Sequence, residues 1–245
     1  MRTLAIILAS GRGSRMGKLT KNLPKGLLKI NNTSPVLHQM NNISRSNIDE
    51  LIITTGYCSE KYEKLNVKTI FNKNWSSTNM VSSLMLCNDE ILKFDSVIIS
   101  YSDVFFEEKA LNSIMLTDAD ICLTYDINWK NLWKQRFSDP LVDAESFRVD
   151  KQGCLIEIGN KIDHIDNAKG QFMGLFRFTK IGWKNYYDYL SEKSSEDVKK
   201  MDITTSFKLL IEETPNSIKC LPFDGIWGEI DSEKDVTLYR ANKLI

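Results

Sequence analysis

Short apolar runs alternate with amphipathic stretches through the first half of the chain. The amphipathic stretches have helical spacing and cover Pro35–Arg45, Ser59–Leu65, Asn79–Leu92 and Glu107–Met115. The runs are rich in Ile, Leu and Val and cover Thr3–Ala9, Glu50–Thr55, Val67–Phe71, Ser96–Tyr101 and Asp120–Tyr125. Such alternation is typical of a mostly parallel sheet with helices on both faces. We therefore predict an α/β, Rossmann-like fold with a mixed, mostly parallel sheet that binds ligands at the carboxyl ends of its strands.

The pattern changes after about residue 140. Ser146–Asp150 and Cys154–Ile158 predict a hairpin, because a short turn separates them. The segments that follow predict strands at Phe172–Phe178, Ile218–Pro222 and Ile226–Ile230, and helices at Ile181–Lys193, Asp202–Glu212 and from Glu233, with Ser232 and Asp235 as a capping pair. No repeat or Pro/Gly-rich linker divides the sequence. We predict a single domain whose second half contains a small insertion that covers a substrate.

Composition excludes several classes of function. Lys+Arg and Asp+Glu both number 32, so no net charge favours general binding to nucleic acid or to a membrane surface. The five cysteines lack zinc spacing and the chain has two histidines, which argues against a His/Cys metal site. The first apolar run is too short for a signal peptide or a membrane span. We expect a cytoplasmic protein with reduced thiols that binds neither nucleic acid nor membrane.

A glycine-rich loop directly follows the first predicted strand. Residues 8–17 read Leu-Ala-Ser-Gly-Arg-Gly-Ser-Arg-Met-Gly, and Lys25 follows shortly afterwards. Glycines let backbone N–H groups approach phosphates that a Cβ would block. The loop is not a Walker A motif, because five residues rather than four separate Gly11 from Gly17. It is not a dinucleotide-binding fingerprint either, because Met16 replaces the third glycine. The loop therefore predicts a different kind of phosphate-binding turn.

This loop, together with Leu23-Pro24-Lys25, resembles the signature of sugar-phosphate and small-metabolite nucleotidyltransferases. Those enzymes join an NTP to a phosphorylated metabolite and release pyrophosphate. The resemblance implies that Arg15 contacts the outer phosphates and that Lys25 contacts the α-phosphate region, so both are predicted catalytic residues. It implies nucleotide contacts at Leu8, Ala9, Ser10, Gly11 and Gly13. It also implies a nucleotide-binding half at residues 1–140, an acceptor-binding half at 141–225, and a metal segment with a closing helix at 226–245.

Three carboxylates are placed to hold a metal ion. Charge on the transferring phosphates must be neutralised, and Mg²⁺ prefers oxygen ligands. Asp103 follows the predicted strand Ser96–Tyr101, and Asp231 ends a late Trp-Gly-Glu-Ile-Asp segment in which Glu229 points to the same face. The family has one metal aspartate after a mid-chain strand and another in a similar late segment. We predict a Mg²⁺ site at Asp103, Asp231 and Glu229, with helix capping or a turn as the alternative role of the two aspartates.

The segment Thr78–Leu84 narrows the choice of nucleotide. It resembles the Asn-x-x-x-Ser-Leu stretch of cytidylyltransferases that act on small metabolites such as phosphocholine and 2-aminoethylphosphonate. In those enzymes the start of this helix lies beside the nucleotide, so Asn79 and Ser83 are predicted nucleotide contacts. An ordinary helix start with Thr78 as N-cap is the alternative. CTP is implied by this resemblance and not by spacing, because backbone carbonyls can bind the cytosine amino group.

The resemblance implies acceptor contacts at Lys161, Gln171 and Asp202. Gln171 stands where an acidic residue is common in the family, and Asp202 either recognises an ammonium group or caps a helix. Basic residues around Arg136, Arg148 and Lys161 suit an acceptor that also carries a carboxylate. We therefore predict phosphoglutamine, an acceptor used in bacterial capsule phosphoramidate synthesis, with phosphocholine and 2-aminoethylphosphonate as alternatives. The aromatic residues Tyr125, Trp129 and Trp133 either form a wall for a quaternary amine or pack in the core.

The predicted reaction is in-line attack by an acceptor phosphate oxygen on the α-phosphorus of CTP. A phosphate monoester is largely dianionic at pH 7, so no general base is required. Uridylyl or guanylyl transfer to a sugar 1-phosphate is an alternative, because it would share the loop and both aspartates. A regulatory module that binds nucleotide without turnover is disfavoured by Lys25, Asp103 and Asp231, and a dehydrogenase by the glycine pattern. A homodimer is compatible with the resemblance.

Overall fold

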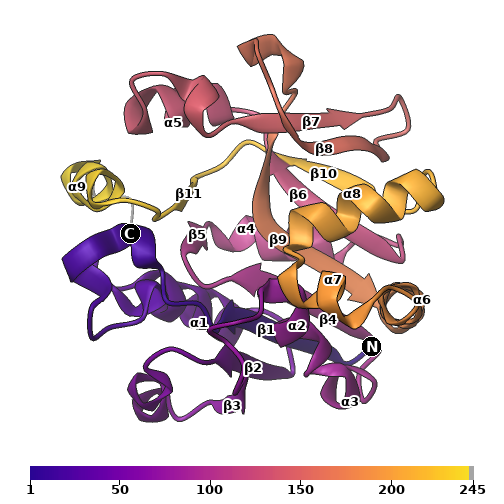
Figure 1. Ribbon diagram of the computed structural model, residues 1–245, viewed down its shortest axis with the longest axis horizontal. Helices are drawn as coiled ribbons and strands as arrows, with labels where there is room; N and C mark the ends of the chain where they lie inside the picture. Colours follow the sequence, from indigo (N-terminus) through magenta and orange to yellow (C-terminus); the bar gives the residue numbers. More distant parts are fainter. Residues whose placement is uncertain (243–245) are drawn as a thin grey trace.

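The computed structural model describes residues 1–242 and is built on a seven-stranded sheet of order β10-β6-β9-β4-β1-β2-β3 (Figure 1). β9 runs antiparallel to both β4 and β6, whereas the other neighbouring strands pair in parallel. The strands of this sheet are β1 (Thr3–Ala9), β2 (Glu50–Thr55), β3 (Lys68–Phe71), β4 (Ser96–Tyr101), β6 (Ile121–Asp126), β9 (Gln171–Thr179) and β10 (Lys219–Phe223). The predicted mixed, mostly parallel sheet is confirmed.

Helices pack on both faces of this sheet because successive residues of a strand point to opposite sides. Leu4 and Ile6 of β1 belong to one buried cluster, and Ala5 and Ile7 belong to the other. The first cluster includes side chains of α2 (Met80–Met85), α3 (Asn88–Ile91), α6 (Lys180–Ser191), α7 (Ser195–Lys200) and α8 (Ile203–Glu213). The second includes side chains of α1 (Pro35–Arg45), α4 (Glu108–Met115) and α5 (Trp129–Arg136).

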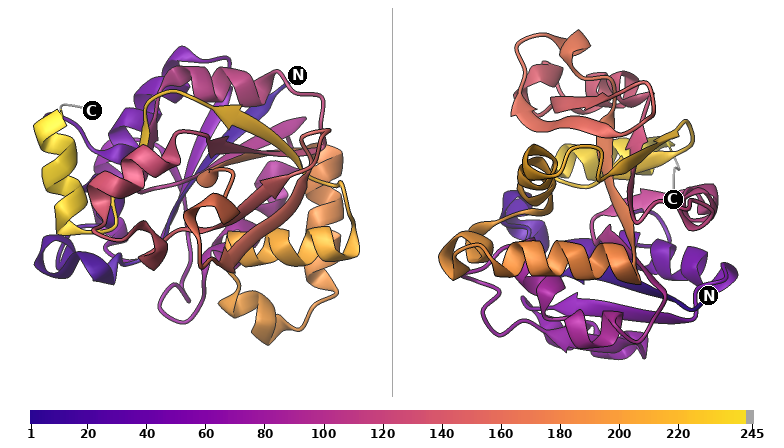
Figure 2. Two further views of the ribbon diagram at one scale, coloured as in Figure 1. Left: turned by 90° about the horizontal axis from the view of Figure 1, so that it is seen from above. Right: turned by 90° about the vertical axis from the view of Figure 1, so that its right-hand side faces the viewer.

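The second half of the chain adds a layer at one end of the molecule. A hairpin of β7 (Glu145–Val149) and β8 (Leu155–Lys161) lies there beside α5, and the views in Figures 1 and 2 agree on this position. A short pair, β5 (Val104–Phe106) with β11 (Trp227–Glu229), connects the late segment to the end of β4. The late segment continues into α9 (Glu233–Asn242), which lies beside the glycine-rich loop.

The predicted strands of the first half agree with the structure to within one residue at each end. The predicted helix at Ser59–Leu65 is wrong, because the segment forms two 3₁₀ turns. The stretch Asn79–Leu92 forms two short helices rather than one. The Ser232–Asp235 capping pair is confirmed, since the Ser232 N–H donates to Asp235 Oδ2 at 2.8 Å and the Asp235 N–H donates to Ser232 Oγ at 3.3 Å.

The sequence pattern did not predict β5, α5 or α7. The end of the predicted closing helix, residues 243–245, lies outside the described residues. Within residues 1–242, no helix is both long and apolar enough to cross a membrane.

Candidate active site

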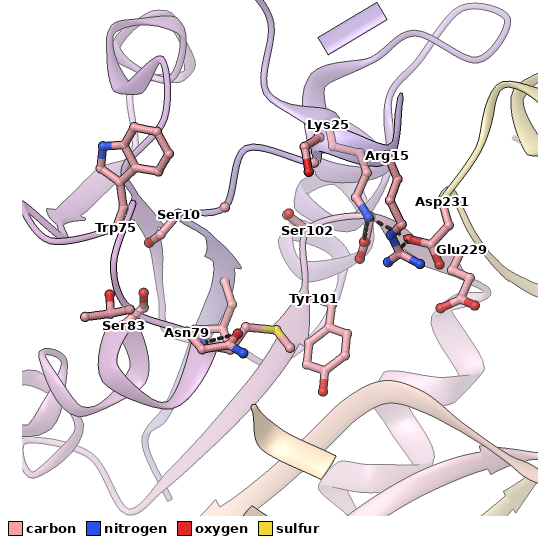
Figure 3. Close-up of a pocket in the computed structure, with 17 residues that line it drawn as sticks. Ser10, Arg15, Lys25, Trp75, Asn79, Ser83, Tyr101, Ser102, Glu229 and Asp231 are labelled. Carbon is pink, nitrogen blue, oxygen red and sulfur yellow. Dashed lines mark hydrogen bonds and ion pairs between the residues drawn. The ribbon is translucent and has the colours of Figure 1, made fainter. Parts of the chain in front are cut away.

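A cavity of about 350 Å³ opens at the carboxyl ends of β1 and β4 (Figure 3). Its lining contains Leu8, Ser10, Gly11 and Gly13 of the loop, Asn79 and Ser83 of the α2 region, and the predicted catalytic and metal residues Arg15, Lys25, Asp103, Glu229 and Asp231. Ala9 does not line the cavity, because its side chain packs in the core beneath it. The structure thus gathers these residues where parallel strands end, as the sheet predicts.

The loop has a conformation that favours glycine. Gly13 has φ +67°, and a Cβ at this position would lie 2.8 Å from Cβ of Lys25. Gly11 differs, since a Cβ there would meet no atom within 4 Å. Met16 is fully buried in a cluster with Ile230 and Tyr239, which anchors the loop against the late segment and α9. Gly13 therefore lets the loop and Lys25 lie close together.

Asn79 and Ser83 face the loop from the other wall of the cavity, and both already have partners (Figure 3). Asn79 is itself the N-cap of α2, because its Oδ1 accepts a hydrogen bond from the Met80 N–H at 2.8 Å. The alternative N-cap, Thr78, is therefore wrong. Ser83 Oγ accepts a hydrogen bond from Asn72 Nδ2 at 3.0 Å. Hydrogen bonds within the protein therefore hold both side chains in this wall.

Lys25 lies between the two predicted metal aspartates. Its Nζ contacts Asp103 and bonds to Asp231 Oδ1 at 2.8 Å, and Arg15 Nη2 reaches the same oxygen at 2.8 Å. Burial opposes the charged form of Lys25, but the two carboxylates outweigh it and raise the pKa of the ammonium group. Burial also opposes ionisation of Asp231, but Lys25, Arg15 and Arg136 outweigh it and lower the pKa of the carboxyl group. The centre is therefore a network of full charges at the base of the cavity.

The donor set suits a cation that is completed by substrate oxygens. Among residues 1–242, no cluster of three or more His, Cys, Asp or Glu side chains is arranged to hold a metal ion. Asp103 and Asp231 nevertheless share one cation, Lys25, and both line the cavity. Mg²⁺ is commonly held by one or two carboxylates together with phosphate oxygens and water. These two residues therefore fit Mg²⁺ in the presence of a nucleotide.

Glu229 lines the same cavity but has a strong partner. Its Oε1 accepts a hydrogen bond from Arg136 Nη1 at 2.6 Å. Burial, the largest effect, raises the pKa of Glu229 to about 7 even though Arg136 opposes this shift. A metal contact by Glu229 stays a prediction, and the ion pair to Arg136 is a feature that the sequence did not reveal.

A second cavity of about 440 Å³ adjoins the first, and Arg15, Tyr101, Glu229 and Asp231 line both. Further carboxylates line it at Asp143, Glu145 and Asp202, together with the rings of Phe147 and Phe172. Burial, assisted by the charges of Asp202 and Asp143, raises the pKa of Glu145. The cavity beside the loop is therefore strongly acidic and partly aromatic.

The three predicted acceptor residues separate in the structure. Gln171 lines the second cavity, and its Nε2 donates to the backbone oxygen of Glu145 at 2.7 Å. Asp202 lines it as well and caps α8, accepting from the Thr205 N–H at 2.7 Å. Lys161 lines a different depression, on the far part of the hairpin. Its role as an acceptor contact stays a prediction that the geometry does not favour.

The expected basic surroundings of the acceptor are wrong. Arg136 is buried among carboxylates, and Arg148 is half exposed and pairs with Glu157 at 3.3 Å. The aromatic residues mostly pack in the core, since Trp129 is 1% exposed and Tyr125 stacks on Phe147 with ring centroids 4.8 Å apart. Trp133 is also buried but contributes to the wall of the second cavity.

Comparison with known proteins gives concordant results. A model of the MobA-like NTP transferase domain matches residues 5–127. The chain is 29% identical to the CTP:phosphoglutamine cytidylyltransferase of Campylobacter jejuni, over 95% of this chain and 97% of that protein. It is 25% identical to the choline-phosphate cytidylyltransferase of Streptococcus pneumoniae, over 86% of this chain and 98% of that protein.

Solved structures share the fold. The inositol-1-phosphate CTP transferase of T. maritima superposes with a TM-score of 0.75 at 23% identity, covering 100% of this chain and 96% of that one. The CTP:phosphocholine cytidylyltransferase of Streptococcus pneumoniae superposes with a TM-score of 0.70 at 20% identity, covering 99% of this chain and 100% of that one. The fold around the cavity is therefore that of nucleotidyltransferases.

Proposed function

This chain belongs to the MobA-like NTP transferase family, and we propose that it is a CTP-dependent cytidylyltransferase that transfers CMP to a small phosphorylated amino metabolite and releases pyrophosphate. The observation that carries the proposal is the convergence of Lys25 and Arg15 on Asp231 beside the glycine-rich loop. In this proposal residues 1–140 hold the nucleotide, residues 141–225 cover the acceptor, and the segment from residue 226 supplies Asp231.

The chemistry follows from the positions of the charges. Backbone N–H groups of the loop hold the triphosphate, while Lys25 and Arg15 stabilise the charge that develops on the transferring phosphate and on pyrophosphate. Mg²⁺ held by Asp103 and Asp231 would neutralise further charge on the phosphate oxygens. An oxygen of the acceptor phosphate attacks the α-phosphorus, the bond to pyrophosphate breaks, and no proton needs to be removed from the dianion.

The acidic cavity supports an acceptor that carries a cationic nitrogen. Asp143, Glu145 and Asp202 would attract an ammonium group, and the rings of Phe147 and Phe172 suit an alkylated one. Among the described residues that line this cavity, Arg15 is the sole cation available for an acceptor carboxylate or phosphate. A hexose 1-phosphate has no cation to place there, so sugar 1-phosphates are disfavoured.

Phosphoglutamine is the leading acceptor in this proposal. It combines a phosphate with an α-ammonium group, and the similarity to the phosphoglutamine enzyme extends over 95% of the chain. The product would then serve capsule phosphoramidate synthesis. Phosphocholine and 2-aminoethylphosphonate are the alternatives, because they also carry a cationic nitrogen. The choline-phosphate enzyme is similar to 86% of this chain, and a 2-aminoethylphosphonate cytidylyltransferase is similar to 44% of it.

A panel of nucleotides and acceptors tests the proposal. Pyrophosphate release is measured with CTP, UTP, GTP and ATP, each with phosphoglutamine, phosphocholine, 2-aminoethylphosphonate and glucose 1-phosphate. We expect CTP with a cationic acceptor to give the highest kcat/KM. Higher activity of UTP or GTP with glucose 1-phosphate would contradict the proposal, and CTP binding without pyrophosphate release would indicate a regulatory module.

Two carboxylate variants locate the acceptor. Asp143→Asn and Glu145→Gln should raise the KM of the acceptor and leave the KM of CTP unchanged, because both residues line the second cavity alone. Glu157→Gln is the matched control, since Glu157 lies on the same hairpin outside both cavities. An unchanged KM of the acceptor in both cavity variants would show that the ammonium group of the acceptor does not bind beside these two carboxylates.

A further inference from the structure

Arg136, at the end of α5, is buried among the carboxylates of the late segment. Its side chain is 0% exposed. Nη1 donates to Glu229 at 2.6 Å, and Nε donates to Asp235 Oδ1 at 2.9 Å while Nη2 reaches the other oxygen of Asp235 at 3.4 Å. Nη2 also lies 3.5 Å from Asp231 Oδ2. One guanidinium group thus contacts Glu229 and Asp231 of the late segment and Asp235 of α9.

Aromatic rings fix the position of the Arg136 side chain. Its guanidinium carbon lies 4.9 Å from the ring centroid of Trp133 and 5.0 Å from that of Phe137. Trp133 in turn stacks on Trp227, with centroids 5.9 Å apart and an interplanar angle of 12°. A planar fork held between rings can bind two carboxylates at once, which a lysine ammonium group cannot do with the same geometry.

The contacts lead from Arg136 to the backbone of Asp231. Asp235 Oδ2 accepts hydrogen bonds from the N–H groups of Asp231 at 2.9 Å and Ser232 at 2.8 Å. The side-chain oxygen Oδ1 of Asp231 contacts Lys25 at 2.8 Å. Arg136 therefore contacts one oxygen of Asp231, while Lys25 and Arg15 contact the other oxygen at the base of the cavity.

We propose that Arg136 is a positioning residue that sets the orientation of Glu229 and Asp231 for nucleotidyl transfer. It does so from α5, a helix that precedes the acceptor half in the sequence. This inference rests on the proposed function. Without Arg136, the carboxyl groups of Glu229, Asp231 and Asp235 would lose the buried cation that they share, and with it the contacts that fix their orientation beside the cavity. Outer contacts of this kind typically contribute about 10- to 100-fold to metal affinity.

The experiment compares Arg136→Met and Arg136→Lys with the wild type. The readouts are the dissociation constant of Mn²⁺ in the presence of CTP, the kcat and KM for CTP, and the midpoint of thermal unfolding. The double variant Arg136→Met/Asp235→Asn removes one of the unpaired buried charges, and the asparagine side chain that replaces Asp235 keeps an oxygen for the backbone N–H groups. We therefore expect the double variant to be more stable than Arg136→Met and to remain folded if the single variant unfolds. Trp129→Phe is the matched control, because Trp129 is buried on the same helix and no hydrogen bond or ion pair joins its side chain to the described late segment.

We expect Arg136→Met and the double variant to weaken Mn²⁺ binding by about 10- to 100-fold and to lower kcat more than they raise the KM of CTP. The Mn²⁺ affinity and the kcat of Arg136→Lys should lie between those of these variants and those of the wild type. Trp129→Phe should lower only the unfolding midpoint. A folded double variant that binds Mn²⁺ as tightly as the wild type would overturn the inference and assign Arg136 to stability alone. Turnover of the wild type with CTP separately tests the proposed function, since the Mn²⁺ measurement requires no turnover.

Discussion

Lys25 is the residue at which stability, metal dependence and catalysis are most closely connected. Its Nζ contacts Asp103 and Asp231, and its side chain is 13% exposed. Methionine has a similar length without the charge, so Lys25→Met leaves two carboxylates facing each other across the base of the cavity. A hydrogen bond to a charged group contributes about 1.5–3 kcal/mol. With some solvent screening, we expect the free energy of unfolding without metal to fall by roughly 2–4 kcal/mol.

The same substitution should have a separate effect on turnover. Loss of one preorganised donor to a developing oxyanion lowers kcat by about 10²–10³-fold. Added Mg²⁺ should restore stability to the variant more than to the wild type, because the ion supplies the positive charge that Lys25 no longer places between the carboxylates. In the absence of nucleotide, the variant is therefore predicted to bind Mg²⁺ more tightly than the wild type. With Mg²⁺ and CTP present, it should still turn over more slowly than the wild type.

The assay is urea denaturation with and without Mg²⁺, together with pyrophosphate release under saturating CTP. Lys18→Met is the matched control, because Lys18 lies in the same loop but is exposed and does not line the cavity. A variant at Lys25 that retains wild-type kcat would refute its catalytic role. Equal destabilisation of this variant with and without Mg²⁺ would refute the idea that the two aspartates can share a cation other than Lys25.

Three further predictions concern single residues. Asp103→Asn should lower kcat with CTP by about 10²–10³-fold, and near-normal turnover would exclude it from the site. Gly13→Ala should lower the unfolding free energy by roughly 1–2 kcal/mol because φ is +67°, while Gly11→Ala, which has open space, should unfold like the wild type in the same urea titration. Burial raises the pKa of Asp126 from 3.8 to about 6, so the folded protein retains a proton that the unfolded chain has lost, and stability falls as pH rises through this range. Asp126→Asn should therefore raise the free energy of unfolding by up to about 3 kcal/mol near pH 7.5 and by almost nothing near pH 3, and an equal gain at both pH values in calorimetry would contradict the assignment.

The parts of this site that follow from local sequence were predictable. Strands buried on both faces leave continuous apolar runs, so the ends of β1 and β4 were correctly located and with them the loop and Asp103. Asp231 was predictable from its place in a distinctive late segment. The position of β9 between β4 and β6 was not, because pairing order depends on contacts across the whole chain.

The helix α5 shows why the remainder escaped prediction. Trp129–Arg136 is largely polar, and its buried face consists of two tryptophans and the arginine itself. Arg136 meets carboxylates that lie 93 and 99 positions further along the chain, so no local spacing reveals that it is neutralised. In the sequence it resembled a basic group available to an acceptor, and its partners in the fold give it the opposite role. The acidic second cavity escaped prediction for the same reason, because Asp143, Glu145 and Asp202 come from different elements of the fold.

The most direct test of the central claim is ³¹P NMR of CTP and phosphoglutamine incubated with the wild-type protein and with Asp103→Asn in the presence of Mg²⁺. We predict that the wild type converts the α-phosphate of CTP into a new diphosphate-linked CMP product with one equivalent of pyrophosphate, and that the variant forms both at least about 100-fold more slowly. CTP that remains intact in the presence of phosphoglutamine, or a variant as fast as the wild type, would contradict this prediction.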